Sequence, residues 1–190
     1  MTVPNGVTSI GYSAFYNCTA LTSVSLPMTL EAIGDQAFGL CTSLTGFQVD
    51  ENNPHFTTDD TGALYSKDFT TLYQVPGVTA GFVIPSTVTN VNYGAFWGCY
   101  GLTDVEIPDS VTIIGDWAFS DCDALTEAVI PDSVTALGEY AFAFCDQLAN
   151  VTLSENLTVI PYRAFKECPE LTDILIPDSV QIIDGAAFDT

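Results

Sequence analysis

Positive charge is scarce in this chain. Of its 190 residues, 3 are lysine or arginine and 24 are aspartate or glutamate, so the formal net charge is −21. Such a charge repels nucleic-acid phosphates and anionic lipids, which excludes DNA, RNA and acidic membrane surfaces as partners. Basic protein surfaces and metal cations remain as candidates. The plain alternative is that the acids only keep an apolar, repetitive protein in solution.

Long apolar runs are also missing. No stretch approaches the ~20 consecutive apolar residues of a membrane span, so we expect no membrane insertion. The opening residues lack the basic and apolar regions of a signal peptide. Two locations follow from this: extracellular or cell-surface as part of a longer chain, which we favour, or intracellular.

Histidine is almost absent, since His55 is the only one and lies in a turn-rich loop. A nucleophile needs a base to activate it, and no such partner is at hand. The chain has neither a Gly-x-Ser-x-Gly elbow nor a glycine-rich phosphate loop. We therefore expect a non-enzymatic protein and assign no catalytic residues and no cofactor.

What the chain does have is a repeat. An Ala-Phe pair recurs every 23 residues, with one gap of 58, and cysteine, leucine and proline columns follow it at fixed distances. Four columns in one phase are not expected by chance. The phenylalanines are Phe15, Phe38, Phe96, Phe119, Phe142, Phe165 and Phe188, and the cysteines are Cys18, Cys41, Cys99, Cys122, Cys145 and Cys168.

One coil shows how the repeat would fold. Leu102, Val105 and Ile107 have the L-x-x-L-x-L spacing of a leucine-rich repeat. Val105 and Ile107 would point inward and Glu106 outward, as in a strand, and Pro108 would end that strand because it lacks an N–H.

The rest of the coil returns the chain to the next strand. The segment from Gly115 to Cys122 suits one helical turn, with Phe119 in the core. One coil cannot bury its own apolar stripe, so the coils must stack. The prediction is a mainly-β leucine-rich-repeat solenoid over residues 1–190, with short strands and single helical turns.

Residues 50–84 break the period, since they hold one coil plus 12 extra residues. Two β-rich runs flank the polar turn Ser66-Lys67-Asp68. The pattern predicts an irregular, extended coil in which a β-hairpin bulges from the solenoid.

The consensus Pro-x-x-Val-Thr-x-Ile-Gly-x-x-Ala-Phe-x-x-Cys-x-x-Leu-Thr-x-Val-x-Ile-Pro resembles the BspA-type leucine-rich repeat over essentially the whole chain. The resemblance implies a right-handed solenoid of a kind found in surface or secreted proteins of bacteria and some protists, associated with adhesion. It brings no catalytic residues with it. The chain departs from the pattern at Pro161 and Asp184, in the usual glycine place, and at Tyr93-Gly94.

The cysteines share one column, so we expect reduced, buried thiols, with bridging between adjacent coils or metal binding as alternatives. No metal site is assigned. Weak calcium candidates are the acids of the irregular coil, because Ca²⁺ prefers several oxygen ligands. They are Asp50, Glu51, Asp59 and Asp60.

Stacking would align the outward strand residues into one surface, our candidate binding site. The expected function is a protein-binding, adhesin-like module. One alternative is a structural module that assembles head to tail into filaments through uncapped ends, and another is an intracellular scaffold. The simplest interpretation is that the strand surface is only solvated and binds no ligand. The candidate residues are Ser23, Ser25, Gln48, Asp104, Glu106, Glu127, Val129, Asn150, Thr152, Asp173 and Leu175.

Overall fold

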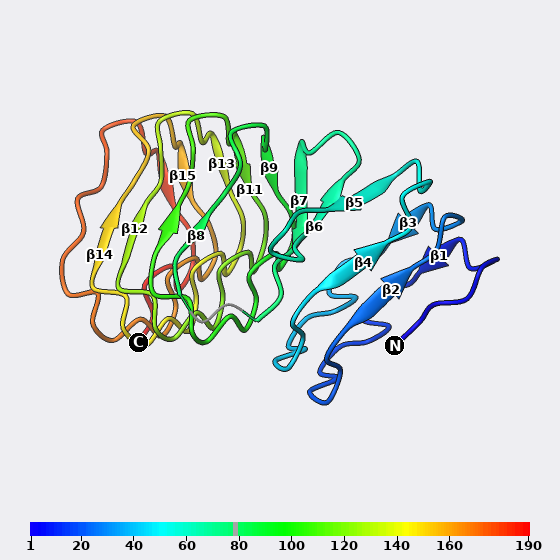
Figure 1. Cartoon of the computed structure of the whole chain (residues 1–190). Helices are drawn as coiled ribbons and strands as arrows, with labels where there is room; N and C mark the ends of the chain where they lie inside the picture. Colours follow the sequence, from blue (N-terminus) through cyan, green and yellow to red (C-terminus); the bar gives the residue numbers. More distant parts are fainter. Residues whose placement is uncertain (78–79) are drawn as a thin grey trace.

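The computed structural model describes residues 1–77 and 80–190, and the chain winds as a solenoid of stacked coils (Figure 1). The described residues contain sixteen short strands and no helix. The strands are short because each coil offers only a few alternating residues before a proline, glycine or turn ends them. The predicted mainly-β leucine-rich-repeat solenoid is confirmed.

One row of strands forms the surface that we call the strand face. Each of its strands pairs in parallel with one neighbour a coil away, so that Glu127 lies beside Asn150 and Val129 beside Thr152. The residue between them, Ala128, is buried. The strand face consists of β2 (Val24–Leu26), β4 (Phe47–Val49), β8 (Phe82–Val83), β10 (Val105–Glu106), β12 (Glu127–Val129) and β14 (Asn150–Thr152).

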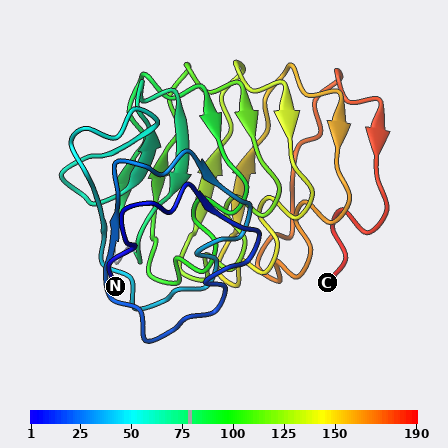
Figure 2. The ribbon, with the colours of Figure 1, turned by 90° about the vertical axis from the view of Figure 1, so that its right-hand side faces the viewer.

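A second row of strands follows the next side of each coil, and Figure 2 shows its arrows side by side. Its pairing is also parallel, with Ile114 beside Val91 on one side and Leu137 on the other. The second row consists of β1 (Ser9–Ile10), β3 (Ala32–Ile33), β9 (Asn90–Val91), β11 (Ile113–Ile114), β13 (Ala136–Leu137), β15 (Val159–Ile160) and β16 (Ile182–Ile183).

The third side, which we call the turn row, corrects one prediction. The segment from Gly115 to Cys122 forms successive turns, so the predicted helical turn is wrong. Trp117 and Asp121 have left-handed φ angles of 57° and 56°, which break a helical hydrogen-bond pattern. These angles turn the N–H groups of Trp117, Phe119 and Asp121 to carbonyls of the next coil. Each coil is thus bonded to its neighbour where a helix would have bonded to itself.

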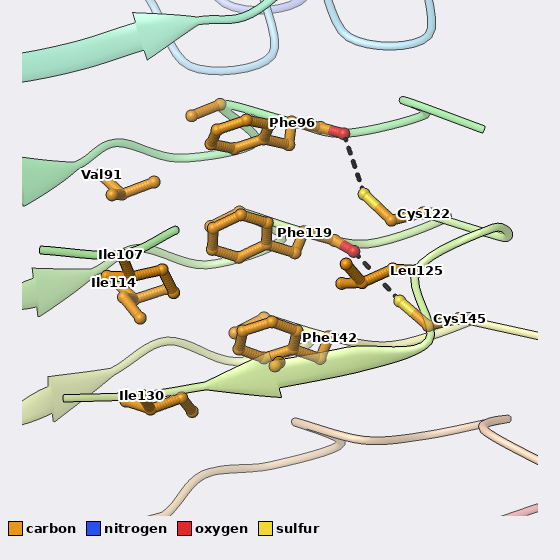
Figure 3. Close-up of a cluster of buried hydrophobic side chains, with 14 of the residues drawn as sticks. Val91, Phe96, Ile107, Ile114, Phe119, Cys122, Leu125, Ile130, Phe142 and Cys145 are labelled. Atoms are coloured by element: carbon orange, nitrogen blue, oxygen red, sulfur yellow. Dashed lines mark hydrogen bonds between the residues drawn. The ribbon is translucent and has the colours of Figure 1, made fainter. Parts of the chain in front are cut away.

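The phenylalanine column stacks through the core. Phe119 lies between Phe96 and Phe142, with ring centroids 4.6 and 4.8 Å away. The cysteine thiols lie beside it (Figure 3), and those of Cys41, Cys122, Cys145 and Cys168 each donate to the carbonyl of the phenylalanine 26 residues earlier. Cys122 donates to Phe96 at 3.4 Å, and Cys145 to Phe119 at 3.2 Å. A small apolar residue with a weak donor therefore suits this column.

The irregular coil contains β5 (Phe56–Thr58), β6 (Leu64–Ser66) and β7 (Thr71–Gln74). β5, β6 and β7 pair antiparallel, and β7 then pairs in parallel with β9, so the segment continues the second row. Residues 78 and 79 of the predicted segment lie outside the described residues. Val75 takes the phenylalanine place, because its N–H donates to the Ala95 carbonyl at 2.7 Å.

The buried apolar residues form two clusters, one from Val3 to Leu64 and one from Ala63 to Ala187. They meet at the irregular coil, where Tyr73 contacts the first cluster and Leu72 belongs to the second. The Tyr73 ring packs edge-on against Phe56, 5.3 Å between centroids. The solenoid is therefore continuous in backbone but divided in its core.

Candidate binding face

The structure places the predicted site residues on the exposed side of the strand face. All are exposed except Ser25, which is half-buried. They fall into two groups, because the irregular coil separates Ser23, Ser25 and Gln48 from the remainder. Within the larger group the side chains lie in two columns that run across the coils. One column holds Asp104, Glu127, Asn150 and Asp173, and the other holds Glu106, Val129, Thr152 and Leu175.

Sequence reasoning missed one member of this surface. Val83 in β8 lies beside Glu106 and is 66% exposed, which makes it an apolar start to the second column. Val129 and Leu175 continue the apolar contribution at 49% and 81% exposure. The sequence spacing could have identified Val83, because it stands two residues before Pro85, as Glu106 does before Pro108.

Two shallow hollows lie on the strand face. The first, of about 360 Å³, is bordered by uncharged groups such as Asn5, Ser25 and Gln48, together with Asp50. The second, of about 370 Å³, lies between β14 and the last coil. Residues lining the second hollow are Glu127, Ala149, Asn150, Val151, Thr152, Thr172, Asp173, Ile174 and Leu175.

The few cations of the chain lie away from this face. Lys67 is in the turn between β6 and β7, where its Nζ donates to the Glu51 carbonyl at 3.2 Å. Arg163 and Lys166 are on the turn row, and the Arg163 guanidinium lies 4.7 Å from the Tyr162 ring centroid. The strand face therefore keeps an uncompensated negative charge.

An aromatic band on the turn row was not foreseen. Trp97 packs on Trp117 at 4.9 Å between centroids, and Trp117 stacks on Tyr140 at 4.1 Å. The Trp97 Nε1 donates to Asp121 at 2.9 Å. The rings cover one another's faces, so this band stabilises the turn row.

The six cysteines are free thiols, and Cys18 is the exposed one. Burial raises the pKa of the Cys122 and Cys145 thiols well above the ordinary value. A thiol held neutral in this way is a poor nucleophile and a poor metal ligand. In this structure the buried thiols of Cys122 and Cys145 donate hydrogen bonds to the preceding coil.

The turn row also carries an acidic cluster. Burial, and then the charges of Asp146 and Asp121, raise the pKa of Asp123 to about 6. Neighbouring carboxylates in successive coils disfavour a second negative charge. The cluster therefore makes part of the stability of the regular coils depend on pH.

The weak calcium candidates are not brought together. Both oxygens of Asp59 already accept hydrogen bonds, including one from the Tyr65 hydroxyl at 2.9 Å. Asp50 Oδ1 accepts from the Asn52 N–H, also at 2.9 Å. Within residues 1–77 and 80–190, no three His, Cys, Asp or Glu side chains are placed to hold a metal ion.

The repeated coils have a counterpart among known families. The BspA type leucine-rich repeat region matches six copies over residues 1–73 and 70–190. The chain belongs to this family. A search of curated proteins finds no relative.

Solved structures of bacterial leucine-rich repeat proteins resemble this member of the BspA-type family. A leucine-rich repeat protein from Eubacterium ventriosum is 25% identical, with a TM-score of 0.70, over 100% of this chain and 63% of its own. A leucine rich cell surface protein from Faecalibacterium prausnitzii is 24% identical, with a TM-score of 0.64, over 99% and 50%. The pneumococcal vaccine antigen PcpA is 20% identical, with a TM-score of 0.61, over 98% and 62%.

The chain spans less than two thirds of the length of each of these proteins. The similarity to the Faecalibacterium prausnitzii protein and to PcpA, which are 24% and 20% identical, concerns the fold alone. The BspA-type family is one of non-catalytic repeat proteins, and it suggests a module for protein interaction or adhesion. In the described part of the chain, no helix is long and apolar enough to cross a membrane.

Proposed function

We propose that this chain is a protein-binding, adhesin-like module that takes its ligand on the strand face. The observation that carries the proposal is the alignment of outward side chains from successive coils into two exposed columns. Stacked repeats offer such surfaces for binding, because the surface is broad and its positions are fixed by the core below.

The chemistry of the columns indicates the kind of ligand. Asp104, Glu106 and Glu127 concentrate negative charge near the middle of the face, and Val83 and Val129 add exposed apolar surface on either side of Glu106. A basic or mixed protein surface would pair with these acids, and charge pairing of this kind speeds association. We infer that the module is displayed at the cell surface within a longer chain.

Charge reversal tests the proposal. Binding would be measured on immobilised extracellular proteins of differing charge, with the variant Asp104→Lys, Glu106→Lys, Glu127→Lys beside the parent. The control is Glu139→Lys, Asp146→Lys, Glu170→Lys, which makes the same change of charge at exposed sites away from the strand face. We expect the first variant to lose a ligand that the control keeps. Equal loss in both would remove the strand face from consideration.

End-to-end assembly is the second candidate function. The last coil exposes Ile182 and Ile183, each by 54%, in β16, which ends the second row of strands. Light scattering across protein concentration tests it. Mass that grows in the parent and not in Ile182→Ser, Ile183→Ser would support filaments, and a monomer at every concentration would exclude them.

A further inference from the structure

The hydrogen-bond ladder of the strand face is interrupted after β14. Between β8 and β10 it is formed, because the N–H groups of Phe82 and Ile84 donate to the Asp104 and Glu106 carbonyls at 3.1 Å. The equivalent donors in β14 are on Val151 and Leu153, and the equivalent acceptors are on Asp173 and Leu175. No such bond joins them within the described residues, and residues 172–176 form no strand.

The interruption coincides with an open space. The hollow of about 370 Å³ has β14 on one side and residues 172–175 on the other. Figure 1 shows the trace of the last coil standing away from β14 at this level. The ladder is also interrupted between β10 and β12, but the hollow is what gives the place beside β14 room for another chain.

Unpaired strand edges readily accept a further strand, because they present a row of free donors and acceptors. Here the open edge of β14 faces residues 173–176 across one space, and within the described chain those four residues form no backbone hydrogen bond. A segment lying parallel to β14 could bond to Val151 and Leu153 on one side and to residues 173–176 on the other. It would take the position of one additional strand in the row, held there by backbone hydrogen bonds.

The lining residues specify side chains for that segment. Alternate residues of a strand face opposite ways. The first outward residue would lie between Asn150 and Asp173, with Glu127 one coil further, so it should be basic. The next would point inward beside Val151 and Ile174, so it should be apolar. The third would lie between Thr152 and the 81% exposed Leu175, so it should be aliphatic.

We propose that the slot between β14 and residues 172–176 binds an extended peptide segment with a basic–apolar–aliphatic core by adding it as a strand. This refines the proposed function, on which it rests, by naming the ligand class and the binding mode at one place on the strand face. Because the backbone supplies the bonds, many partners with this short pattern would fit, and the two acids would select against acidic ones.

The test uses a capped peptide, Thr-Lys-Val-Leu-Thr, titrated into the whole chain by calorimetry, with amide exchange followed in parallel. We expect binding, with slower exchange of the Val151 and Leu153 amides. The same peptide with methylated backbone nitrogens should bind roughly tenfold more weakly or not at all, because it cannot donate to the open edge. A peptide with glutamate in place of lysine should also fail.

Protein variants locate the site. The variant Glu127→Gln, Asp173→Asn should weaken peptide binding by about tenfold, since both charges flank the lysine position. Its matched control is Asp104→Asn, Glu106→Gln, which removes two charges beside the closed β8–β10 ladder and should change binding by less than about twofold. Neither pair of side chains lies in the core.

Three results would overturn the slot: no binding of the peptide, equal binding of its methylated form, or equal loss in both double variants. The strand-face function fails separately, if the triple charge reversal leaves capture of a protein ligand unchanged. A protein ligand lost in that triple variant, together with a peptide that ignores backbone methylation, would keep the general function and reject strand addition.

Discussion

The regular coils and the irregular coil are joined to their neighbours by different interactions. In the regular coils, stacked phenylalanines and turn-row hydrogen bonds repeat from coil to coil. In the irregular coil, Val75 fills the phenylalanine place and Asn53 fills a place that Leu30, one coil earlier, occupies with an apolar side chain. The comparison teaches that an interrupted repeat needs polar bonds where apolar stacking stops.

Asn53 shows how such bonds work. It is 1% exposed, and its Nδ2 donates to the Pro27 and Leu30 carbonyls at 2.8 and 3.0 Å. Its Oδ1 accepts from the N–H groups of His55 and Phe56, both at 2.8 Å. The side chain thus uses its full bonding capacity to fasten the extra residues to the coil before them.

The largest effect is expected for Phe119→Ala. The ring is fully buried between two others, so its loss should lower the free energy of unfolding by about 3–5 kcal/mol. Val75→Ala at the same ladder place in the irregular coil should lower it by about 1–2 kcal/mol. Chemical denaturation compares the two. Equal losses would mean that the irregular coil stacks as the regular coils do.

Asn53→Leu tests the polar substitute. It copies the apolar residue of the preceding coil but leaves the N–H groups of His55 and Phe56 and the Leu30 carbonyl without their partner, and we expect a loss of about 2–3 kcal/mol. Amide exchange at His55 and Phe56 should rise, while exchange at Phe119 and Phe142 should not. Uniform loss of protection across the chain would show that the two cores unfold as one.

Gly115→Ala should cost about 1–2 kcal/mol, because an added Cβ would lie 2.9 Å from the Tyr93 backbone nitrogen of the preceding coil. Gly11→Ala is its control, since nothing lies within 4 Å of a Cβ there. Comparing the melting temperatures of the two variants separates the steric effect of the added Cβ from the general effect of replacing a glycine. A harmless Gly115→Ala would mean that neighbouring coils can shift apart.

The smallest effect concerns Asp123. Its pKa is raised from 3.8 to about 6 in the folded chain, so the folded state binds the extra proton between those pH values and stability falls as pH rises through them. Asp123→Asn should therefore stabilise by at most about 1 kcal/mol at pH 7, since solvent screens this partly exposed group. Denaturation at pH 5 and pH 7 checks it: the gain should shrink at the lower pH.

Much of the fold could be predicted, because each column leaves a direct trace in the sequence. The phase of Phe119, Cys122 and Leu125 gives the coil, and the alternation around Glu106 gives the strand face. The 12 additional residues of the irregular coil show where the period breaks. These features depend on which positions are buried, and the pattern of apolar residues in the sequence indicates those positions well.

The turn row could not be read in the same way. Trp117, Tyr140 and Arg163 all have a left-handed φ that is rare for bulky residues, so local preference favours other conformations there. Bonds to the next coil outweigh that preference. The sequence did contain one sign of this conformation. In one coil, glycine occupies both positions that have a left-handed φ, with φ of 58° at Gly94 and 75° at Gly98. The interrupted ladder beside β14 has no sequence signature, since residues 173–176 keep the strand pattern.

The divided core has a mechanical consequence. The regular coils are fastened to their neighbours by turn-row bonds and stacked rings, but where the two apolar clusters meet the ring column is interrupted, because Val75 takes the place between Phe38 and Phe96. A pulling force on the ends of such a solenoid passes through every junction in series, and the weakest gives way first. Under tension the module would part at the irregular coil, leaving the coils that carry Asp104 through Asp173 folded and still able to hold a ligand.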